Sequence, residues 1–263
     1  MDLNFFKKTR ILDGGMGQEL LARKMKPNGT LWSANALLQK KYHKLLLNTH
    51  LDFIRAGAEV IVTTTFTTRK MRLRDNGVED KFEYLNIQAG KIAQEAKKNY
   101  PNVLVAGGLP PQFLTYEADT RNDNEIKDNF YSQAKLLNPY VDFFYFDVLS
   151  SVKEFKIAIE SIEEFNKPYL IGAHISEGKN LPSGEKISEI ITDIKHSKLL
   201  GIILSCISPE NFHLNFNEIK NLGIPFGFKL NAFKTTNPKP NYTSRYKKSK
   251  TGNPNEFLGV RED

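Results

Sequence analysis

The sequence has a single cysteine and no long apolar run. Cys206 is the only cysteine in 263 residues, which excludes an internal disulfide framework and is typical of a reducing compartment. No stretch approaches the roughly 18 uninterrupted apolar residues of a membrane span. The opening residues, MDLNFFKKTRILDGG, show no apolar segment that ends at a small-residue cleavage site. We therefore expect a cytoplasmic protein with no membrane partner.

One segment lacks acidic residues altogether. Residues 234–250, KTTNPKPNYTSRYKKSK, hold six basic side chains and contribute much of the net charge of +7. Two prolines and many Ser, Thr and Asn residues predict an exposed loop or tail. Tyr242 and Tyr246 alternate with the charges, an arrangement that suits stacking on single-stranded nucleic acid. A solvated basic surface explains the same composition, so nucleic acid is not the partner we expect first.

Short β-rich runs alternate with amphipathic segments along the chain, which indicates βα units and a parallel sheet. Strands are expected at residues 10–13, 59–63, 103–107, 142–147, 169–174, 201–206 and 226–230. Helical segments are expected at 31–58, 86–99 and 151–165. Ser151 and Glu154 form a plausible capping box, and Ser208-Pro209 has the pattern of a helix start.

Seven strands are compatible with two architectures. An open doubly wound sheet can stop at seven, whereas a closed (βα)8 barrel needs eight. Both fold types bind ligands at the carboxyl ends of their strands. Polar residues or glycines follow every apolar run here: Asp13-Gly14-Gly15, Thr63 to Thr65, Gly107-Gly108, Asp147, His174, Cys206 and Asn231. We predict a functional site at this edge, although loops also begin there.

The residues alone leave the role of Cys206 open. A lone cysteine on an apolar strand is usually a small, packed core residue. At the end of a strand it can instead be a metal ligand, but one thiolate makes a poor zinc site. Of the five histidines, only His174 ends a predicted strand.

Several motifs resemble one family when they are taken in order. They are ILDGGMGQEL (11–20), LWSA (31–34), THLDFIRAGAEVIVTTTF (49–66), AGGLPPQ (106–112), FDVLSSVKEFKIAIE (146–160) and the ISPE that follows Cys206. Together they resemble the zinc-dependent homocysteine S-methyltransferases. The resemblance implies an α/β fold, a (βα)8 TIM-type barrel. It is incomplete here, because seven strands are visible and the last helix–strand–helix is missing. Residues 1–233 would form a single barrel domain, and 234–263 a basic tail leading to the missing unit.

The resemblance also implies roles for individual residues. Cys206 matches the first zinc ligand of the family. Asp13, with the backbone of Gly14 and Gly15, matches a turn that helps to bind the amino-acid end of homocysteine. Asp147 stands where the family has a glutamate that pairs with the substrate ammonium, and Asn231 matches a polar residue at the end of strand seven. The other two zinc ligands of the family are an adjacent cysteine pair, which this sequence lacks.

The implied reaction transfers a methyl group from a small donor to the zinc-bound thiolate of homocysteine and forms methionine. We expect homocysteine and a methyl donor as partners, zinc as the cofactor of an incomplete site, and a chain that is inactive or impaired. One alternative is a non-catalytic barrel remnant that binds an amino acid or another small molecule. The other is a nucleic-acid-binding protein that uses 234–250. The sequence indicates neither the donor nor the oligomeric state.

Overall fold

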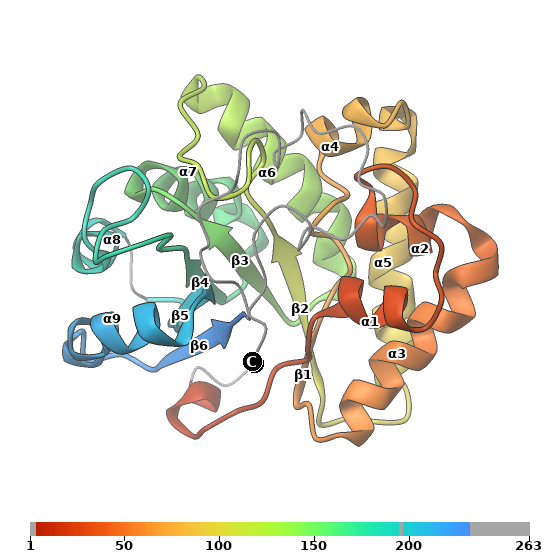
Figure 1. Ribbon diagram of the computed structural model, residues 1–263, viewed down its shortest axis with the longest axis horizontal. Helices are drawn as coiled ribbons and strands as arrows, with labels where there is room; N and C mark the ends of the chain where they lie inside the picture. The colour runs from red at the N-terminus through yellow and green to blue at the C-terminus, as the bar shows by residue number, and fades with distance from the viewer. Residues whose placement is uncertain (1–3, 195–196, 232–263) are drawn as a thin grey trace.

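The centre of the molecule is a single parallel sheet. The computed structural model describes residues 4–194 and 197–231, and its six strands follow one another across the sheet in sequence order (Figure 1). The strands are β1 (Val60–Val62), β2 (Leu104–Leu109), β3 (Phe143–Leu149), β4 (Tyr169–Ala173), β5 (Leu199–Ile207) and β6 (Phe226–Leu230). The α-helices of the described residues are α1 (Met16–Ala22), α2 (Asn35–Leu38), α3 (His43–Arg55), α4 (Lys70–Asp75), α5 (Phe82–Lys97), α6 (Asp123–Leu137), α7 (Val152–Ser161), α8 (Ile187–Asp193) and α9 (Pro209–Asn221).

Both faces of the sheet are buried along its central strands β3 and β4, and successive residues of a strand contribute to opposite faces. In β3, Phe144 and Phe146 belong to the core cluster shared with helix residues such as Phe130 of α6. Phe143 and Tyr145 belong to a separate inner cluster. Parallel sheets covered in this way read as continuous apolar strands, and all seven residues of β3 are buried.

The inner face of the sheet is concave. Lys229 of β6 forms an ion pair with Asp147 of β3, although β4 and β5 lie between these strands in the sheet. Side chains of strands that are not neighbours meet in this way only when the sheet curls around its inner face. The structure therefore confirms the expected α/β fold, an incomplete TIM-type barrel.

The strand expected at residues 10–13 is not formed, so the described sheet has six strands rather than seven. Leu12 makes only an isolated parallel bridge to Val60. The Asp13 amide donates to the Val60 carbonyl, but the next amide, that of Val62, donates to the Asp13 carboxylate and not to a backbone carbonyl. The side chain thereby ends the backbone ladder. Ile11 beside it is 58% exposed.

The helical segment expected at 31–58 is interrupted. Gln39 has an extended backbone that separates α2 from the short 3-10 turn Lys40–Tyr42 and α3. The capping predictions are confirmed at Ser208, whose hydroxyl accepts from the Asn211 amide. At Ser151 the hydroxyl accepts from the Glu154 amide, but the Glu154 carboxylate returns to the Ser150 amide rather than to that of Ser151.

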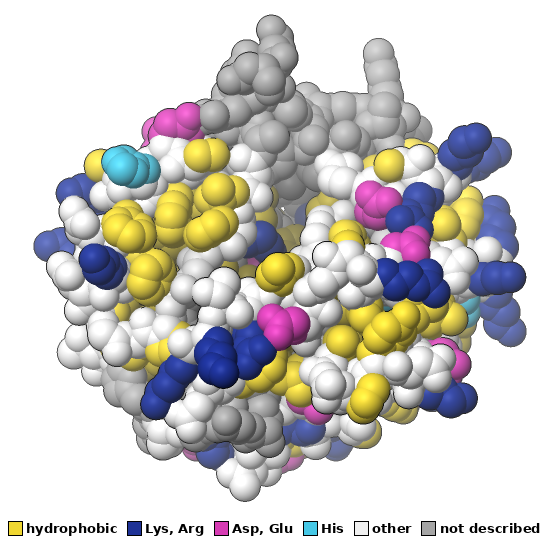
Figure 2. All heavy atoms as spheres, turned by 90° about the horizontal axis from the view of Figure 1, so that it is seen from below, with side chains coloured by type: hydrophobic (Ala, Val, Ile, Leu, Met, Phe, Trp, Pro, Cys, Tyr) yellow, Lys and Arg dark blue, Asp and Glu magenta, His cyan; other side chains and the backbone are white. Residues whose placement is uncertain are grey.

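Apolar side chains are exposed where α9 meets β6. The outward residues of β6, Phe226, Phe228 and Leu230, are at least 40% exposed. Phe228 packs on Phe212 of α9 with ring centroids 4.9 Å apart. Figure 2 shows apolar side chains gathered on the side of the molecule where α9 and β6 lie. Because the three apolar residues of β6 all point outward, Gly227 and Lys229 point into the barrel.

No helix among the described residues is long and apolar enough to cross a membrane. The basic segment 234–250 and the tail expected at 234–263 lie outside the described residues.

Candidate functional site

The predicted site residues come from several strands and reach the same end of the sheet. Asp147 lies near the end of β3 and Cys206 near the end of β5. Asn231 follows β6, and its amide donates to the carbonyl of Ile207, the residue after Cys206. Asp13 lies beside β1, because its amide donates to the Val60 carbonyl. This is the edge at which parallel α/β folds carry their ligand sites.

Two irregularities of strand register coincide with Asp147 and Cys206. The β3–β4 register shifts between Phe146 and Leu149, and the β5–β6 register shifts between Ser205 and Ile207. Such bulges redirect side chains and are over-represented beside active sites. The β5–β6 shift accompanies a Cys206 side chain that packs with Val148 and Tyr116, whereas Asp147 keeps the inward direction of Phe143 and Tyr145.

Backbone strain gathers at the same place. Cys206, Val148 and Tyr116 all have positive φ angles, of 56°, 70° and 69°. For a β-branched residue such as Val148 this conformation is a genuine outlier. The three residues also pack in one cluster with Phe66. Strained residues persist where the surrounding structure enforces them, and they concentrate at functional sites.

Lys229 and Asp147 form an ion pair in the site. The Lys229 Nζ atom donates to both carboxylate oxygens of Asp147 at 2.6 Å. Asp147 is 8% exposed. Burial, the largest single influence, would lower the pKa of Lys229, but the charge and hydrogen bond of Asp147 together with the nearby Cys206 and Tyr145 raise that pKa above its usual value. The Lys229 ammonium is therefore charged at neutral pH.

Lys229 is a site residue that the sequence reasoning missed. The signal was present in FGFKL, where apolar residues alternate with Gly227 and Lys229. A charged residue on the inner face of a barrel strand is a candidate for function. The charge of Lys229 lowers the pKa values of Asp13 and Cys206 relative to burial alone, which places these predicted residues within its electrostatic reach.

Asp13 is buried beside a buried histidine. Its Oδ2 atom lies 3.8 Å from His50 Nδ1, and burial raises the pKa of Asp13 to about 7. Burial also lowers the pKa of His50 to about 4, so this ring is neutral at pH 7. The following turn is tight, because a Cβ at Gly14 would lie 2.8 Å from the ring of Phe53. Gly15 next to it caps α1 and has open space around it.

His174 does not supply a metal ligand beside Cys206. Its Nδ1 atom is 3.1 Å from the Ser205 carbonyl and its Nε2 atom is 2.9 Å from the Ser176 hydroxyl. Both ring nitrogens are thus held by protein partners. Burial lowers the pKa of His174 to about 4 and raises that of the Cys206 thiol. Both side chains are therefore neutral at pH 7, as expected of a packed imidazole and a packed thiol.

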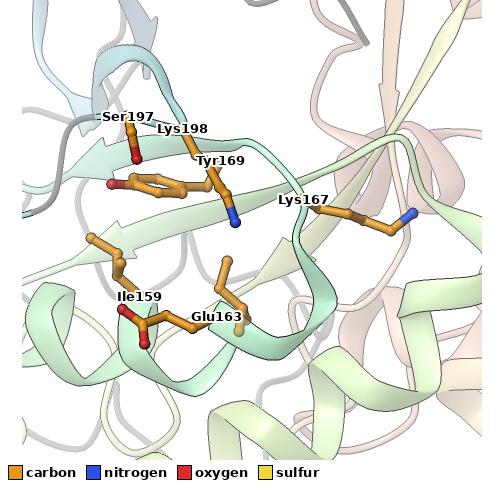
Figure 3. A pocket seen from close by; sticks show the side chains of 7 residues that line it. Ile159, Glu163, Lys167, Tyr169, Ser197 and Lys198 are labelled. Carbon is orange, nitrogen blue, oxygen red and sulfur yellow. The ribbon is translucent and has the colours of Figure 1, made fainter.

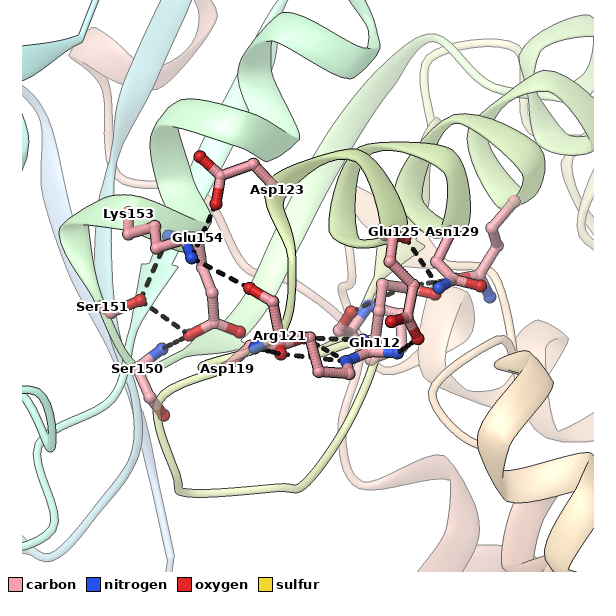
Figure 4. A network of polar contacts seen from close by, with 12 residues as sticks. Gln112, Asp119, Arg121, Asp123, Glu125, Asn129, Ser150, Ser151, Lys153 and Glu154 are labelled. Carbon is pink, nitrogen blue, oxygen red and sulfur yellow. Dashed lines mark hydrogen bonds and ion pairs between the residues drawn. The ribbon is translucent and has the colours of Figure 1, made fainter.

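A polar network braces the loops at this edge (Figure 4). Arg121 pairs with Asp119 in the loop before α6, and its carbonyl accepts from Lys153 of α7. Glu154 of α7 accepts from the Ser150 amide, so the turn after β3 is tied to the same helix. Burial and the nearby Asp119 charge raise the pKa of Glu154 to about 8. The network fixes the turn that follows Asp147.

The described cavities lie away from this site. One of about 300 Å³ is lined by residues of α7, of the turn after it and of the start of β4, including Glu163, Lys167 and Tyr169 (Figure 3). Another, of about 460 Å³, lies between α6, α7 and α8. Neither contains Asp13, Asp147 or Cys206, so neither is the predicted site.

A curled parallel sheet with carboxylates, a thiol and strained backbone at the carboxyl ends of its strands is typical of barrel enzymes of the (βα)8 class. The family model described as homocysteine S-methyltransferase matches residues 10–257. The chain belongs to this family, whose members transfer a methyl group to homocysteine and form methionine.

Curated relatives include enzymes of plants and microorganisms. Homocysteine S-methyltransferase 3 of Zea mays is 25% identical over 230 residues, which cover 77% of this chain and 67% of the relative. Homocysteine S-methyltransferase 2 of Saccharomyces cerevisiae is 26% identical over 235 residues, covering 77% and 70%. The metallated form of the homocysteine methyltransferase MmuM from Escherichia coli superposes with a TM-score of 0.73 at 18% identity. The superposition covers 87% of this chain and 95% of that one, and it supports the fold.

Family membership implies a metal, and the described residues do not fit one by themselves. Catalytic zinc sites use three protein ligands and leave a fourth position open. Within 4–194 and 197–231, no three His, Cys, Asp or Glu side chains are grouped so that they could hold a metal ion. Cys206 is thus a single candidate ligand.

Proposed function

We propose that this chain binds homocysteine at the carboxyl ends of β3, β5 and β6 for methyl transfer to its sulfur. The observation that carries the proposal is the convergence of Asp147 and Cys206 at two register shifts with strained backbone. Asp147 would pair with the substrate ammonium. Asp13 and the Gly14-Gly15 turn would hold the amino-acid end, and Cys206 would mark the sulfur end. Asn231 lies beside Cys206 through its bond to Ile207.

The reaction that the family performs needs a nucleophilic sulfur. The homocysteine thiol loses its proton, the sulfur attacks the methyl carbon of a small donor, and the remainder of the donor leaves with the electrons of the broken bond. A free thiol has a pKa near 8.5 and is mostly protonated at neutral pH. The contribution of the described residues is to bind and orient the amino acid so that its sulfur faces the donor.

Zinc is the metal that we propose for the family site, with Cys206 as one ligand. Two further ligands would be needed for a catalytic site. They are not grouped with Cys206 among the described residues.

A second candidate function is amino-acid binding without methyl transfer. It is favoured by the single cysteine of the 263 residues, because a thiolate-rich zinc site cannot be assembled from one thiol. Nucleic-acid binding through 234–250 stays a prediction, since that segment lies outside the described residues. We also propose that the protein is cytoplasmic.

Calorimetric titration with homocysteine and a methionine-forming assay with S-methylmethionine as the donor test the two functions together. We expect homocysteine to bind and Asp147→Asn to weaken binding at least tenfold, since a hydrogen bond to a charged group contributes about 1.5–3 kcal/mol. Asp142→Asn is a matched control at the other end of β3, where Asp142 pairs with Lys97. Binding with no methionine would support the second function. Failure of homocysteine to bind would reject both.

A further inference from the structure

Lys229 places a positive charge where the resemblance expects only an acidic partner for the substrate. Its neighbours on β6, Phe228 and Leu230, face outward. Lys229 faces inward, with Nζ 5.8 Å from the centre of the Tyr145 ring and within hydrogen-bond distance of Asp147. The lysine is therefore a component of the proposed amino-acid site.

The pair has unused hydrogen-bonding capacity. A lysine ammonium has three donors, and two of those on Lys229 go to the oxygens of Asp147. A carboxylate offers about four lone-pair sites, so Asp147 is able to accept further donors. The Lys229 side chain is 41% exposed, so the side chain is not sealed in the core.

The two charges stand side by side at the spacing of one hydrogen bond. An α-amino acid carries the same two charges on one carbon, an ammonium and a carboxylate. We infer that Lys229 and Asp147 form a clamp for a zwitterionic amino acid, in which Asp147 binds the ammonium and Lys229 binds the carboxylate. This inference rests on the proposed function, and it makes Lys229 the residue that selects amino-acid thiols over other thiols.

Charge balance explains the selectivity. Burying an unpaired charge is costly, and a zwitterion brings equal and opposite charges to a pair that is itself neutral overall. An aminothiol without a carboxylate would set its ammonium near that of Lys229 with no compensating group. A thiol carboxylate without an amine would set its negative charge near Asp147. Each partial ligand thus meets an unfavourable contact that the amino acid avoids.

Three ligands test Lys229 and Asp147 independently. They are homocysteine, 3-aminopropane-1-thiol, which lacks the carboxylate, and 4-sulfanylbutanoate, which lacks the amine. Their dissociation constants are measured by calorimetry with the 263-residue chain under reducing conditions. The variants are K229M, K229R and D147N. The control is K97M, because Lys97 forms a comparable pair with both oxygens of Asp142, at 2.8 and 3.1 Å.

We expect K229M to weaken homocysteine and 4-sulfanylbutanoate binding ten- to a hundredfold and to leave 3-aminopropane-1-thiol unchanged or bound more tightly. K229R should restore most of the affinity for homocysteine. D147N should show the opposite ligand pattern, with the loss confined to the two amines. K97M should change none of the three constants.

Equal losses for all three ligands in K229M, or no loss for homocysteine, would overturn the clamp. If K229M does not fold, D147N still tests the clamp. A loss of affinity in D147N that is equal for 4-sulfanylbutanoate and the two amines would contradict separate roles for Lys229 and Asp147. A wild-type chain that binds no homocysteine would reject the proposed function itself. Homocysteine binding that is indifferent to K229M would leave the proposed function in place and reject only the role of Lys229.

Discussion

Lys229 and Asp147 are 82 residues apart in the sequence, and the ammonium of one lies 2.6 Å from both carboxylate oxygens of the other. Their strands are separated by β4 and β5 in the sheet. The contact therefore spans the concave face and joins the middle of the sheet to β6. It makes the geometry of the site dependent on the curvature of the sheet.

The two halves of this ion pair should differ in their effect on stability. K229M leaves a carboxylate that is 8% exposed without its cation, so we expect a loss of about 2–3 kcal/mol in the free energy of unfolding. D147N leaves a lysine that is 41% exposed and better able to reach water, so its loss should be near 1 kcal/mol. Urea denaturation of both variants and of the double variant measures this difference. A larger loss for D147N than for K229M would contradict it.

The sequence was sufficient for the order of βα units and for the residues at the strand ends, because apolar runs and the polar residues after them are local patterns. It failed at residues 10–13, where the Asp13 side chain takes the Val62 amide and ends the ladder. It also missed Lys229, whose partner lies on a distant strand. The inward position of Lys229 could be predicted from FGFKL, but its pairing with Asp147 and the bond of Asp13 to the Val62 amide leave no local signal. The positive φ angles of Val148 and Cys206 were equally out of reach, since neither residue type favours that conformation.

Glu154 should make stability depend on pH above neutrality. Its pKa is raised from 4.5 to about 8 by burial and by Asp119. The folded chain therefore holds a proton that the unfolded chain has lost, and stability falls as pH rises from about 4.5 through 8. Between pH 7 and 8 the fall attributable to this group is about 1 kcal/mol.

The matched variant is E154Q, which keeps an oxygen to accept from Ser150 and Ser151 but does not titrate. His50 and His174, with pKa values lowered to about 4, reduce the stability as pH falls below 6.5 and contribute little between pH 7 and 8. Denaturant unfolding at pH 7 and pH 8 should show the decline in the wild type and a much smaller one in E154Q. Equal slopes would rule out Glu154 as the source.

Zinc content should be well below one ion per 263-residue chain. The chain has one cysteine, and the described residues contain no group of three candidate ligands, whereas catalytic zinc uses three. Elemental analysis of protein purified without chelator measures the ratio, with C206S as the control. One tightly held zinc per wild-type chain that disappears in C206S would contradict the prediction and would show that Cys206 has partners for the metal.

Cys206 should be strained by its backbone conformation. Its φ angle of 56° costs an ordinary residue about 1–2 kcal/mol relative to glycine. C206A and C206G both remove the thiol, but only glycine relieves the backbone. We expect C206G to be at least as stable as C206A in thermal unfolding, although glycine normally weakens a strand. A clearly lower melting temperature for C206G would show that the conformation is not strained.

A methyl group should be tolerated at Gly15, which caps α1, and rejected at Gly17 inside that helix. A Cβ at Gly17 would lie 2.2 Å from the indole of Trp32, which packs edge-on against Phe66 and has little room to move. A Cβ at Gly15 would meet nothing within 4 Å. Overpacking of this kind costs about 1–3 kcal/mol, so G17A should lower the free energy of unfolding by that amount while G15A changes it by less than about 0.5 kcal/mol. Urea denaturation compares the two variants. Similar losses of unfolding free energy in both would mean that contact with Trp32 does not exclude a side chain at Gly17.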